Sequence, residues 1–74
     1  MRMARLSVYF SLKDIGDSHQ RAQLKQGLDT LPGVTSVSIN DRGYLAVDYD
    51  STGVRQEDIR RKILDLGFSI QQDE

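Results

Sequence analysis

The chain has 74 residues, of which 38% are hydrophobic and 28% charged, and it contains no cysteine. This length suits one domain, residues 1–74, and excludes a multidomain enzyme, while the composition excludes a disordered, collagen-like or membrane-spanning chain. The formal net charge of −1 gives no overall attraction to a polyanion, and without cysteine the domain has neither disulfides nor a thiolate metal site to stabilise it.

The first predicted element is a strand over residues 5–12. Apolar side chains stand at every second position: Leu6, Val8, Phe10 and Leu12. This period of two predicts one sheet face in the core and one in water. Residues 1–5 lead into this strand instead of into the apolar stretch of a secretory signal, so a cytosolic protein without membrane insertion is expected. A start at Met1 and a polar end suit a free-standing protein.

A helix is predicted over residues 18–31. Three leucines have the i, i+4, i+7 spacing of one helix face: Leu24, Leu28 and Leu31. Pro32 and Gly33 end the helix, because proline cannot continue the hydrogen-bond ladder and glycine accepts a positive φ. Gly27 lies beside the leucine stripe, and we interpret it as a packing position that lets the helix approach the sheet closely.

The second half of the chain predicts a hairpin, a helix and a last short strand. Two alternating segments, residues 34–39 and 45–49, flank a turn that contains Asn, Asp and Gly. The helix that follows has an apolar stripe: Ile59, Ile63 and Leu66. The last strand covers residues 68–70. The order β-α-β-β-α-β with right-handed crossovers predicts a ferredoxin-like α+β sandwich, with a four-stranded antiparallel sheet in the order 4-1-3-2 and both helices on one face.

Three short motifs stand at matching positions of this pattern: Leu31-Pro32-Gly33-Val34-x-x-Val37, Tyr49-Asp50 and Asp65-Leu66-Gly67-Phe68. On these motifs the chain resembles the heavy-metal-associated domains of copper chaperones and metal-transporting P-type ATPases, over about residues 6–70. Members of that family bind a soft metal ion with two cysteines in a Gly-Met-Thr-Cys-x-x-Cys loop between the first strand and the first helix. They pass the ion to a partner domain of the same fold.

The resemblance places that loop on residues 14–20 of this chain. Both cysteine positions are lost, to Asp17 and Gln20, whereas Ile15 stands where the family's methionine packs beneath the loop. Cu(I) selects thiolate and thioether ligands, so the resemblance implies the fold without Cu(I) chelation. It implies a non-catalytic interaction or accessory module linked to metal handling. Its partner would be another protein, such as a domain of a metal-transport system or a second copy of the chain.

Asp14, Asp17 and His19 crowd the same loop and form an alternative site. Carboxylates and imidazole are ligands of Zn(II), Ni(II) and Co(II), so the alternative function is to bind a harder divalent ion, and otherwise no cofactor is expected. We favour a structural role. Asp17-x-x-Gln20 has the pattern of a capping box, in which Asp17 accepts a first-turn N–H and Gln20 reaches back to the cap. His19 would then be an exposed first-turn side chain.

No catalytic residue is predicted. The chain has a single histidine and no cysteine, and it shows neither a serine-based triad nor a glycine-rich phosphate loop. We also expect a domain this small to lack the volume for a ligand pocket of about 300 Å³ unless its core opens.

Two surfaces are candidates for binding a protein. The second helix is the most basic segment: Arg55, Arg60, Arg61 and Lys62. We interpret it mainly as a solvated face, because Glu57–Arg61 and Asp58–Lys62 are i, i+4 pairs, with docking of an acidic protein as the functional alternative. The open sheet face offers Tyr9 and Tyr44 as anchors for a partner. It has no Lys or Arg between these aromatic residues, so nucleic acid is not an expected partner.

Overall fold

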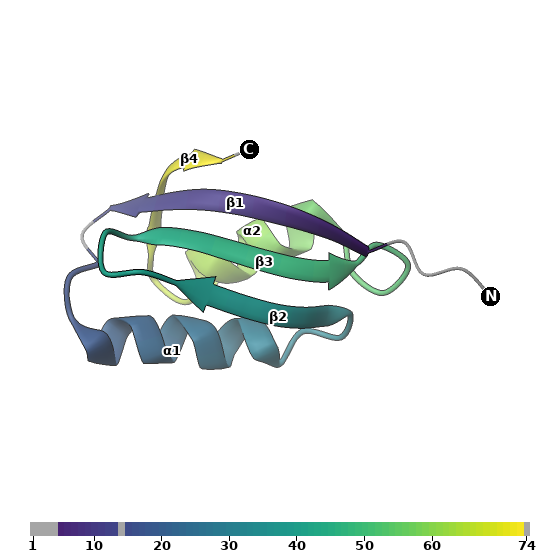
Figure 1. Ribbon diagram of the computed structural model, residues 1–74, viewed down its shortest axis with the longest axis horizontal. Helices are drawn as coiled ribbons and strands as arrows, with labels where there is room; N and C mark the ends of the chain where they lie inside the picture. Colours follow the sequence, from purple (N-terminus) through teal and green to yellow (C-terminus); the bar gives the residue numbers. More distant parts are fainter. Residues whose placement is uncertain (1–4, 14, 74) are drawn as a thin grey trace.

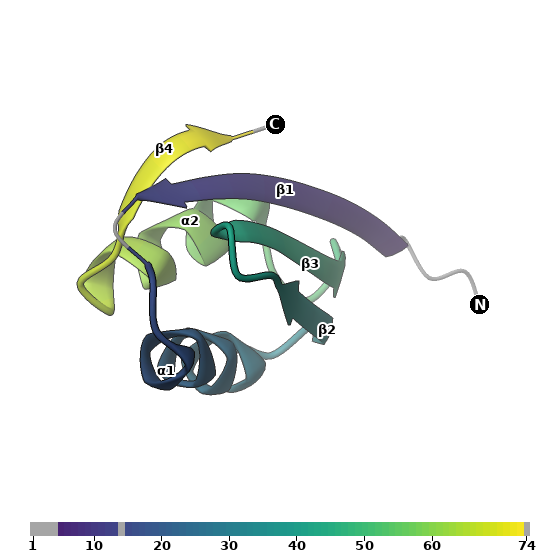
Figure 2. The same cartoon turned by 60° about the vertical axis from the view of Figure 1, so that its left-hand side comes forward.

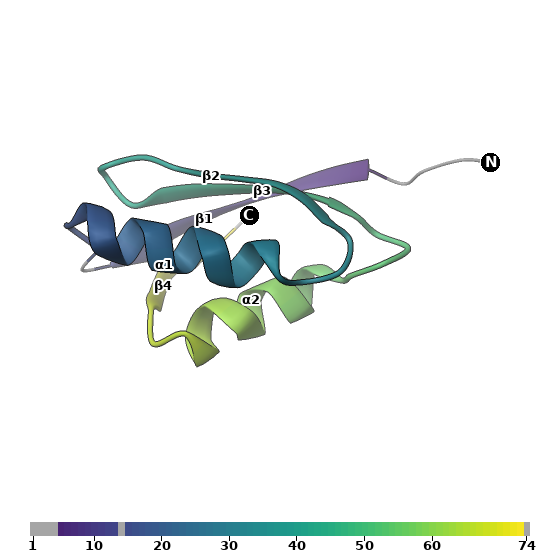
Figure 3. The ribbon, with the colours of Figure 1, turned by 90° about the horizontal axis from the view of Figure 1, so that it is seen from below.

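The computed structural model describes residues 5–13 and 15–73 (Figure 1). The elements follow in the order β1 (Arg5–Lys13), α1 (Ser18–Asp29), β2 (Val34–Ile39), β3 (Tyr44–Asp50), α2 (Gln56–Asp65) and β4 (Ser69–Asp73). The strands pair antiparallel in one sheet, in the order β2-β3-β1-β4. Both helices cover the same face of this sheet, so the predicted ferredoxin-like sandwich is confirmed (Figures 2 and 3). Neither described helix has the length and apolar character needed to span a bilayer.

The core lies between the sheet and the two helices. Its largest fully buried side chains alternate along the strands and follow the apolar stripes of the helices: Val8, Leu45, Val47, Leu24, Leu28, Ile59 and Ile63. Leu31 and Leu66, which complete the two predicted helical stripes, are partly buried and pack against this core. The periodicities of the sequence therefore identify the buried faces of both helices.

Leu6 departs from the predicted core. Its side chain is 49% exposed, whereas Val8, the next residue on the same face, is 1% exposed. The cross-strand partner of Leu6 is Tyr49, which is 4% exposed. Among the described residues, β4 pairs with β1 over residues 10–13, and no strand lies beside Leu6 on that side.

The end of α1 also differs from the prediction. The helix ends at Asp29, and Thr30 is its C-cap, with the Thr30 hydroxyl donating to the Gly27 carbonyl at 2.6 Å. Leu31 cannot continue the helix, because the residue before a proline is disfavoured in the helical region.

Gly27 is a packing position, as predicted, but its contact is with the other helix. A β-carbon at Gly27 would lie 2.5 Å from Cδ1 of Leu66, which caps the C-terminal end of α2. The absence of a side chain therefore lets α1 approach the end of α2, and the expectation that it serves approach to the sheet is wrong.

Candidate functional site

The loop between β1 and α1 is closed by hydrogen bonds to its own backbone. Asp17 is the N-cap of α1, and its Oδ1 accepts a hydrogen bond from the Gln20 backbone N–H at 2.7 Å. The Gln20 side chain turns back, and its Oε1 accepts the Gly16 N–H at 3.4 Å. The guanidinium of Arg21 donates to the Gly16 carbonyl at 3.5 Å. The capping role of Asp17 is confirmed, while Gln20 contacts the residue before the cap and not the cap itself.

Beneath this loop the apolar support is retained. Ile15 is 6% exposed and belongs to the core cluster, as expected if it stands where the resemblance places the family's methionine. The apolar base of the loop is thus present, while Asp17 and Gln20, where the resemblance places the two cysteines, accept backbone N–H groups at the start of α1.

The proposed ligands of a harder ion do not form a recognisable cluster. Asp14 lies outside the described residues. His19 is exposed on the first turn of α1, as predicted, and Asp17 Oδ1 is engaged by the Gln20 N–H. Over residues 5–13 and 15–73, no three His, Asp or Glu side chains gather as a metal site would require. The site for a harder ion stays a prediction.

The basic residues of α2 pair differently from the expectation. Arg55 precedes the helix and lies 3.4 Å from Glu57 and 3.8 Å from Asp58, and its backbone N–H donates to Asp58 Oδ2 at 3.2 Å. Within the described part of the chain, neither carboxylate forms an ion pair with Arg61 or Lys62, so the expected i, i+4 pairs are wrong. Both carboxylates lie in the first turn, where the unpaired N–H groups attract them toward the helix start.

Arg61 and Lys62 line a shallow depression between the end of α1 and α2, with a volume of about 350 Å³. Asp58 and Asp65 line the same depression. The surface is therefore of mixed charge, which weakens its attraction for an acidic partner. Arg60 is exposed on α2 and does not line this depression.

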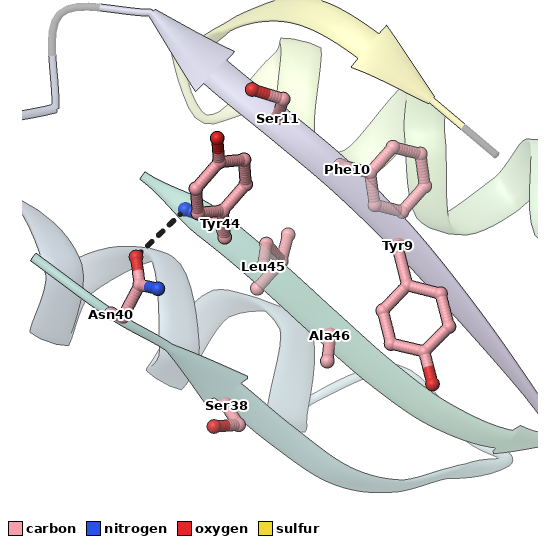
Figure 4. A pocket seen from close by; sticks show the side chains of 8 residues that line it. All are labelled: Tyr9, Phe10, Ser11, Ser38, Asn40, Tyr44, Leu45 and Ala46. Atoms are coloured by element: carbon pink, nitrogen blue, oxygen red, sulfur yellow. Dashed lines mark hydrogen bonds between the residues drawn. The ribbon is translucent and has the colours of Figure 1, made fainter. Parts of the chain in front are cut away.

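The helix-free face of the sheet carries an open hollow of about 460 Å³ (Figure 4). Tyr9 on β1 and Tyr44 on β3 flank it, with side chains 55% and 56% exposed. Ala46 pairs with Tyr9 on one side and with Ser38 on the other, and Ser11 pairs with Tyr44. Small side chains therefore line the sheet surface between two aromatic rings. The expectation that a pocket would require opening the core is wrong, because this hollow lies outside a closed core.

Asn40 lines one end of this hollow. It was not identified from the sequence as a site residue. Its Oδ1 accepts the backbone N–H groups of Arg42 at 2.9 Å and Tyr44 at 3.0 Å, which fixes the β2–β3 turn and the start of β3. The Asn-Asp-Arg-Gly pattern of the turn was the signal that could have revealed this role. None of the described residues that line the hollow is charged.

No protein-family model matches the chain, and no curated protein sequence matches it. Among solved structures, oxidized MerP from Ralstonia metallidurans CH34 is similar with a TM-score of 0.83 at 18% identity, over 93% of this chain and 100% of that one. A CopZ metallochaperone has a TM-score of 0.83 at 23% identity, over 88% of this chain and 98% of its own.

The water-soluble region of the P-type ATPase CopA from Bacillus subtilis has a TM-score of 0.87 at 24% identity, over 95% of this chain and 47% of that one. At these identities the likeness shows the fold alone. The chain has the heavy-metal-associated type of ferredoxin-like fold, without its cysteines.

Proposed function

We propose that this domain is a non-catalytic protein-binding module that keeps the heavy-metal-associated type of fold and does not chelate Cu(I). The closure of the first loop carries the proposal. Asp17 and Gln20 stand where the resemblance puts the ligating cysteines, and their side chains bind the backbone at the start of α1. Carboxylate and amide oxygens are poor ligands for Cu(I), which prefers sulfur.

The proposed partner is a domain of a metal-transport system. A metallochaperone and a P-type ATPase region share the fold, and this supports a partner from the same setting. We assign the first contact to the sheet hollow, because exposed tyrosines provide large contact area at little entropic cost. The hollow is uncharged, whereas the cations of the α2 depression lie beside carboxylates.

The loss of Cu(I) chelation is tested by competition against a chromophoric Cu(I) chelator under anaerobic conditions. The natural chain should leave the chelator's Cu(I) complex unchanged. The double variant Asp17→Cys with Gln20→Cys should withdraw one equivalent, because Ile15 and the rest of the loop scaffold are retained. Stoichiometric Cu(I) uptake by the natural chain would overturn the proposal.

Partner binding is tested by NMR titration of the labelled domain with the soluble domains of a metal-transporting P-type ATPase from the same organism. Saturable shifts are expected at the sheet face. The affinity derived from them should fall about tenfold or more when Tyr9 and Tyr44 are both changed to Ala. Leu64→Ala is the matched control, because Leu64 is a similarly exposed large side chain on α2. A spectrum that does not change on adding either the metal-free or the metal-loaded ATPase domains would refute this partner.

A further inference from the structure

The floor of the sheet hollow is a strand whose backbone is already paired on both sides. β3 lies inside the sheet, with β1 on one side and β2 on the other (Figure 1). Ala46, in the middle of the floor, pairs with Tyr9 on β1 and with Ser38 on β2. The N–H and C=O groups of such a strand are used within the sheet. An occupant of the hollow therefore contacts side chains and forms no main-chain ladder with the floor.

The side chains around the hollow offer hydrogen-bonding groups of their own. Four carry hydroxyls and one carries an amide: Tyr9, Ser11, Ser38, Tyr44 and Asn40. Asn40 Oδ1 already accepts two backbone N–H groups, and the Asn40 nitrogen is directed toward the hollow in Figure 4. Among the described residues, neither this NH2 group nor the four hydroxyls have a hydrogen-bond partner. A hydroxyl can donate or accept, whereas the NH2 group only donates, so the hollow suits an occupant rich in acceptors.

A proline-rich segment has the matching chemistry. Proline has no backbone N–H, and a polyproline II helix forms no internal hydrogen bonds, so its carbonyl groups are free acceptors. Any other extended segment would bring N–H groups over a floor that offers them no backbone carbonyl, and each N–H left unpaired on burial costs free energy. Proline rings also pack on aromatic side chains, which is how proline-rich segments dock into aromatic grooves.

The two tyrosines stand at a spacing that fits this helix. Tyr9 pairs with Ala46 and Tyr44 pairs with Ser11, so the tyrosines occupy diagonal positions of the β1–β3 pair. Diagonal positions lie about 7–8 Å apart, and the two tyrosine hydroxyls point in opposite directions in Figure 4. One turn of polyproline II, three residues at about 3.1 Å each, spans about 9 Å. The rings are therefore placed to contact two prolines that lie one turn apart.

The charges around the hollow favour an uncharged occupant. None of the described residues that line it is charged. On the same face, Asp48 lies two positions after Ala46 on β3, and its carboxylate accepts the hydroxyl of Ser7. An acidic segment would approach this carboxylate, and a charged side chain laid over the uncharged floor would lose water without gaining a partner.

We propose that the hollow between Tyr9 and Tyr44 binds an uncharged, proline-rich segment of the partner protein in the polyproline II conformation. The two rings hold prolines one turn apart, and the Asn40 NH2 group and the tyrosine hydroxyls donate to the carbonyls of the segment. This inference rests on the proposed protein-binding function and specifies which kind of segment the partner contributes.

NMR titration of the labelled domain with two capped peptides tests the proposal. The probe has about nine residues, or three turns, of repeating Pro-Pro-Ser, and the control peptide repeats Ala-Ala-Ser at the same length. The probe should give saturable shifts confined to the residues that line the hollow. The control should bind about tenfold more weakly or not at all, because its backbone N–H groups have no acceptor on the floor. An unchanged spectrum with the probe, or equal binding of the two peptides, would overturn the proposal.

Variants separate recognition from loss of fold. Asn40→Asp removes the NH2 donor but keeps an oxygen for the N–H groups of Arg42 and Tyr44, so the turn is retained and probe binding should weaken about threefold or more. The amide signals of Arg42 and Tyr44 report whether the turn is intact. Changing Tyr9 and Tyr44 to Ala should abolish binding of the probe, and Leu64→Ala should preserve it. Full binding in Asn40→Asp, or in the double tyrosine variant, would refute the assigned contacts.

The remaining outcomes also decide the proposal. If the ATPase domains shift the sheet face while the proline probe does not bind, this inference fails and the protein-binding function stands. If the probe binds and the ATPase domains do not, the named partner fails and the proline site stands. A dimer in sedimentation whose dissociation shifts the signals of Tyr9 and Tyr44 would make a second copy the occupant. Shifts of the hollow by a neutral oligosaccharide and none by the probe would make it a carbohydrate. Either result would overturn the proposal.

Discussion

A β-carbon on Gly43 would lie 2.8 Å from the carbonyl oxygen of Leu12, so the β2–β3 turn packs directly against the end of β1. Gly43 has a φ of 86° and also approaches Cγ2 of Ile15, to which a β-carbon would come within 3.0 Å. This contact joins the hairpin turn to the base of the first loop. The packing of Gly43 against Leu12 and Ile15 therefore connects the first loop to the turn that precedes Tyr44 of the hollow.

Gly43→Ala should destabilise the domain much more than Gly67→Ala. Both glycines have a positive φ, which costs alanine about 1 kcal/mol, but a β-carbon at Gly67 meets open space whereas one at Gly43 meets the backbone of β1. We expect losses of about 1 kcal/mol for Gly67→Ala and about 3 kcal/mol for Gly43→Ala in urea unfolding. Equal losses would contradict the close packing of the turn on β1.

Asp17→Ala should lower the unfolding free energy by about 1 kcal/mol, because the Gln20 N–H loses its acceptor at the start of α1. Asp17→Ser is the control, since serine is also a good N-cap and should retain most of the stability. Urea unfolding measures both variants. A loss of the same size in Asp17→Ser would show that the carboxylate does something other than cap the helix.

Zinc should not bind the first loop in a saturable way. We expect no stoichiometric NMR shifts of residues 15–20 when the EDTA-stripped domain is titrated with Zn(II), Ni(II) or Co(II), because the described residues supply no cluster of three ligands. The comparison variant is His19→Ala. Saturable shifts in the natural chain that disappear in His19→Ala would establish the alternative, a site for a harder divalent ion.

The pKa of Asp50 should depend on Thr52. The Thr52 hydroxyl and backbone N–H donate to Asp50 Oδ1 at 2.6 and 2.9 Å, and they lower the pKa of this carboxyl, with a smaller contribution from Arg5. A lowered pKa adds stability above the ordinary range of an aspartate, and this stability is lost as pH falls through the folded value. Thr52→Ala should raise the pKa of Asp50, measured by carboxyl NMR titration, and Thr52→Ser should not. An unchanged pKa in Thr52→Ala would exclude the hydroxyl as the main cause.

Side-chain periodicity in the sequence identified most of the fold. The spacing of Leu24 and Leu28 on one helix, and of Ile59 and Ile63 on the other, predicts the buried faces that the structure shows. The cap at Asp17 was equally predictable, because capping joins residues three positions apart. Ion pairing was predicted less well. Glu57 and Asp58 have a basic residue before them, Arg55, and basic residues after them, Arg61 and Lys62. They pair with Arg55, and this depends on the path of the backbone before the helix.

The sequence by itself determined the order of the elements, the buried stripes and the loss of thiolate ligands, because each is a matter of residue type and local spacing. Only the tertiary structure decided which surfaces stay uncovered. The hollow between Tyr9 and Tyr44 follows from the register of β1 against β3. The exposure of Leu6, on the core face of β1 beside the buried Val8, is likewise visible only in the folded domain. Such long-range pairing is set by the packing of the whole domain, and no local pattern in the sequence encodes it.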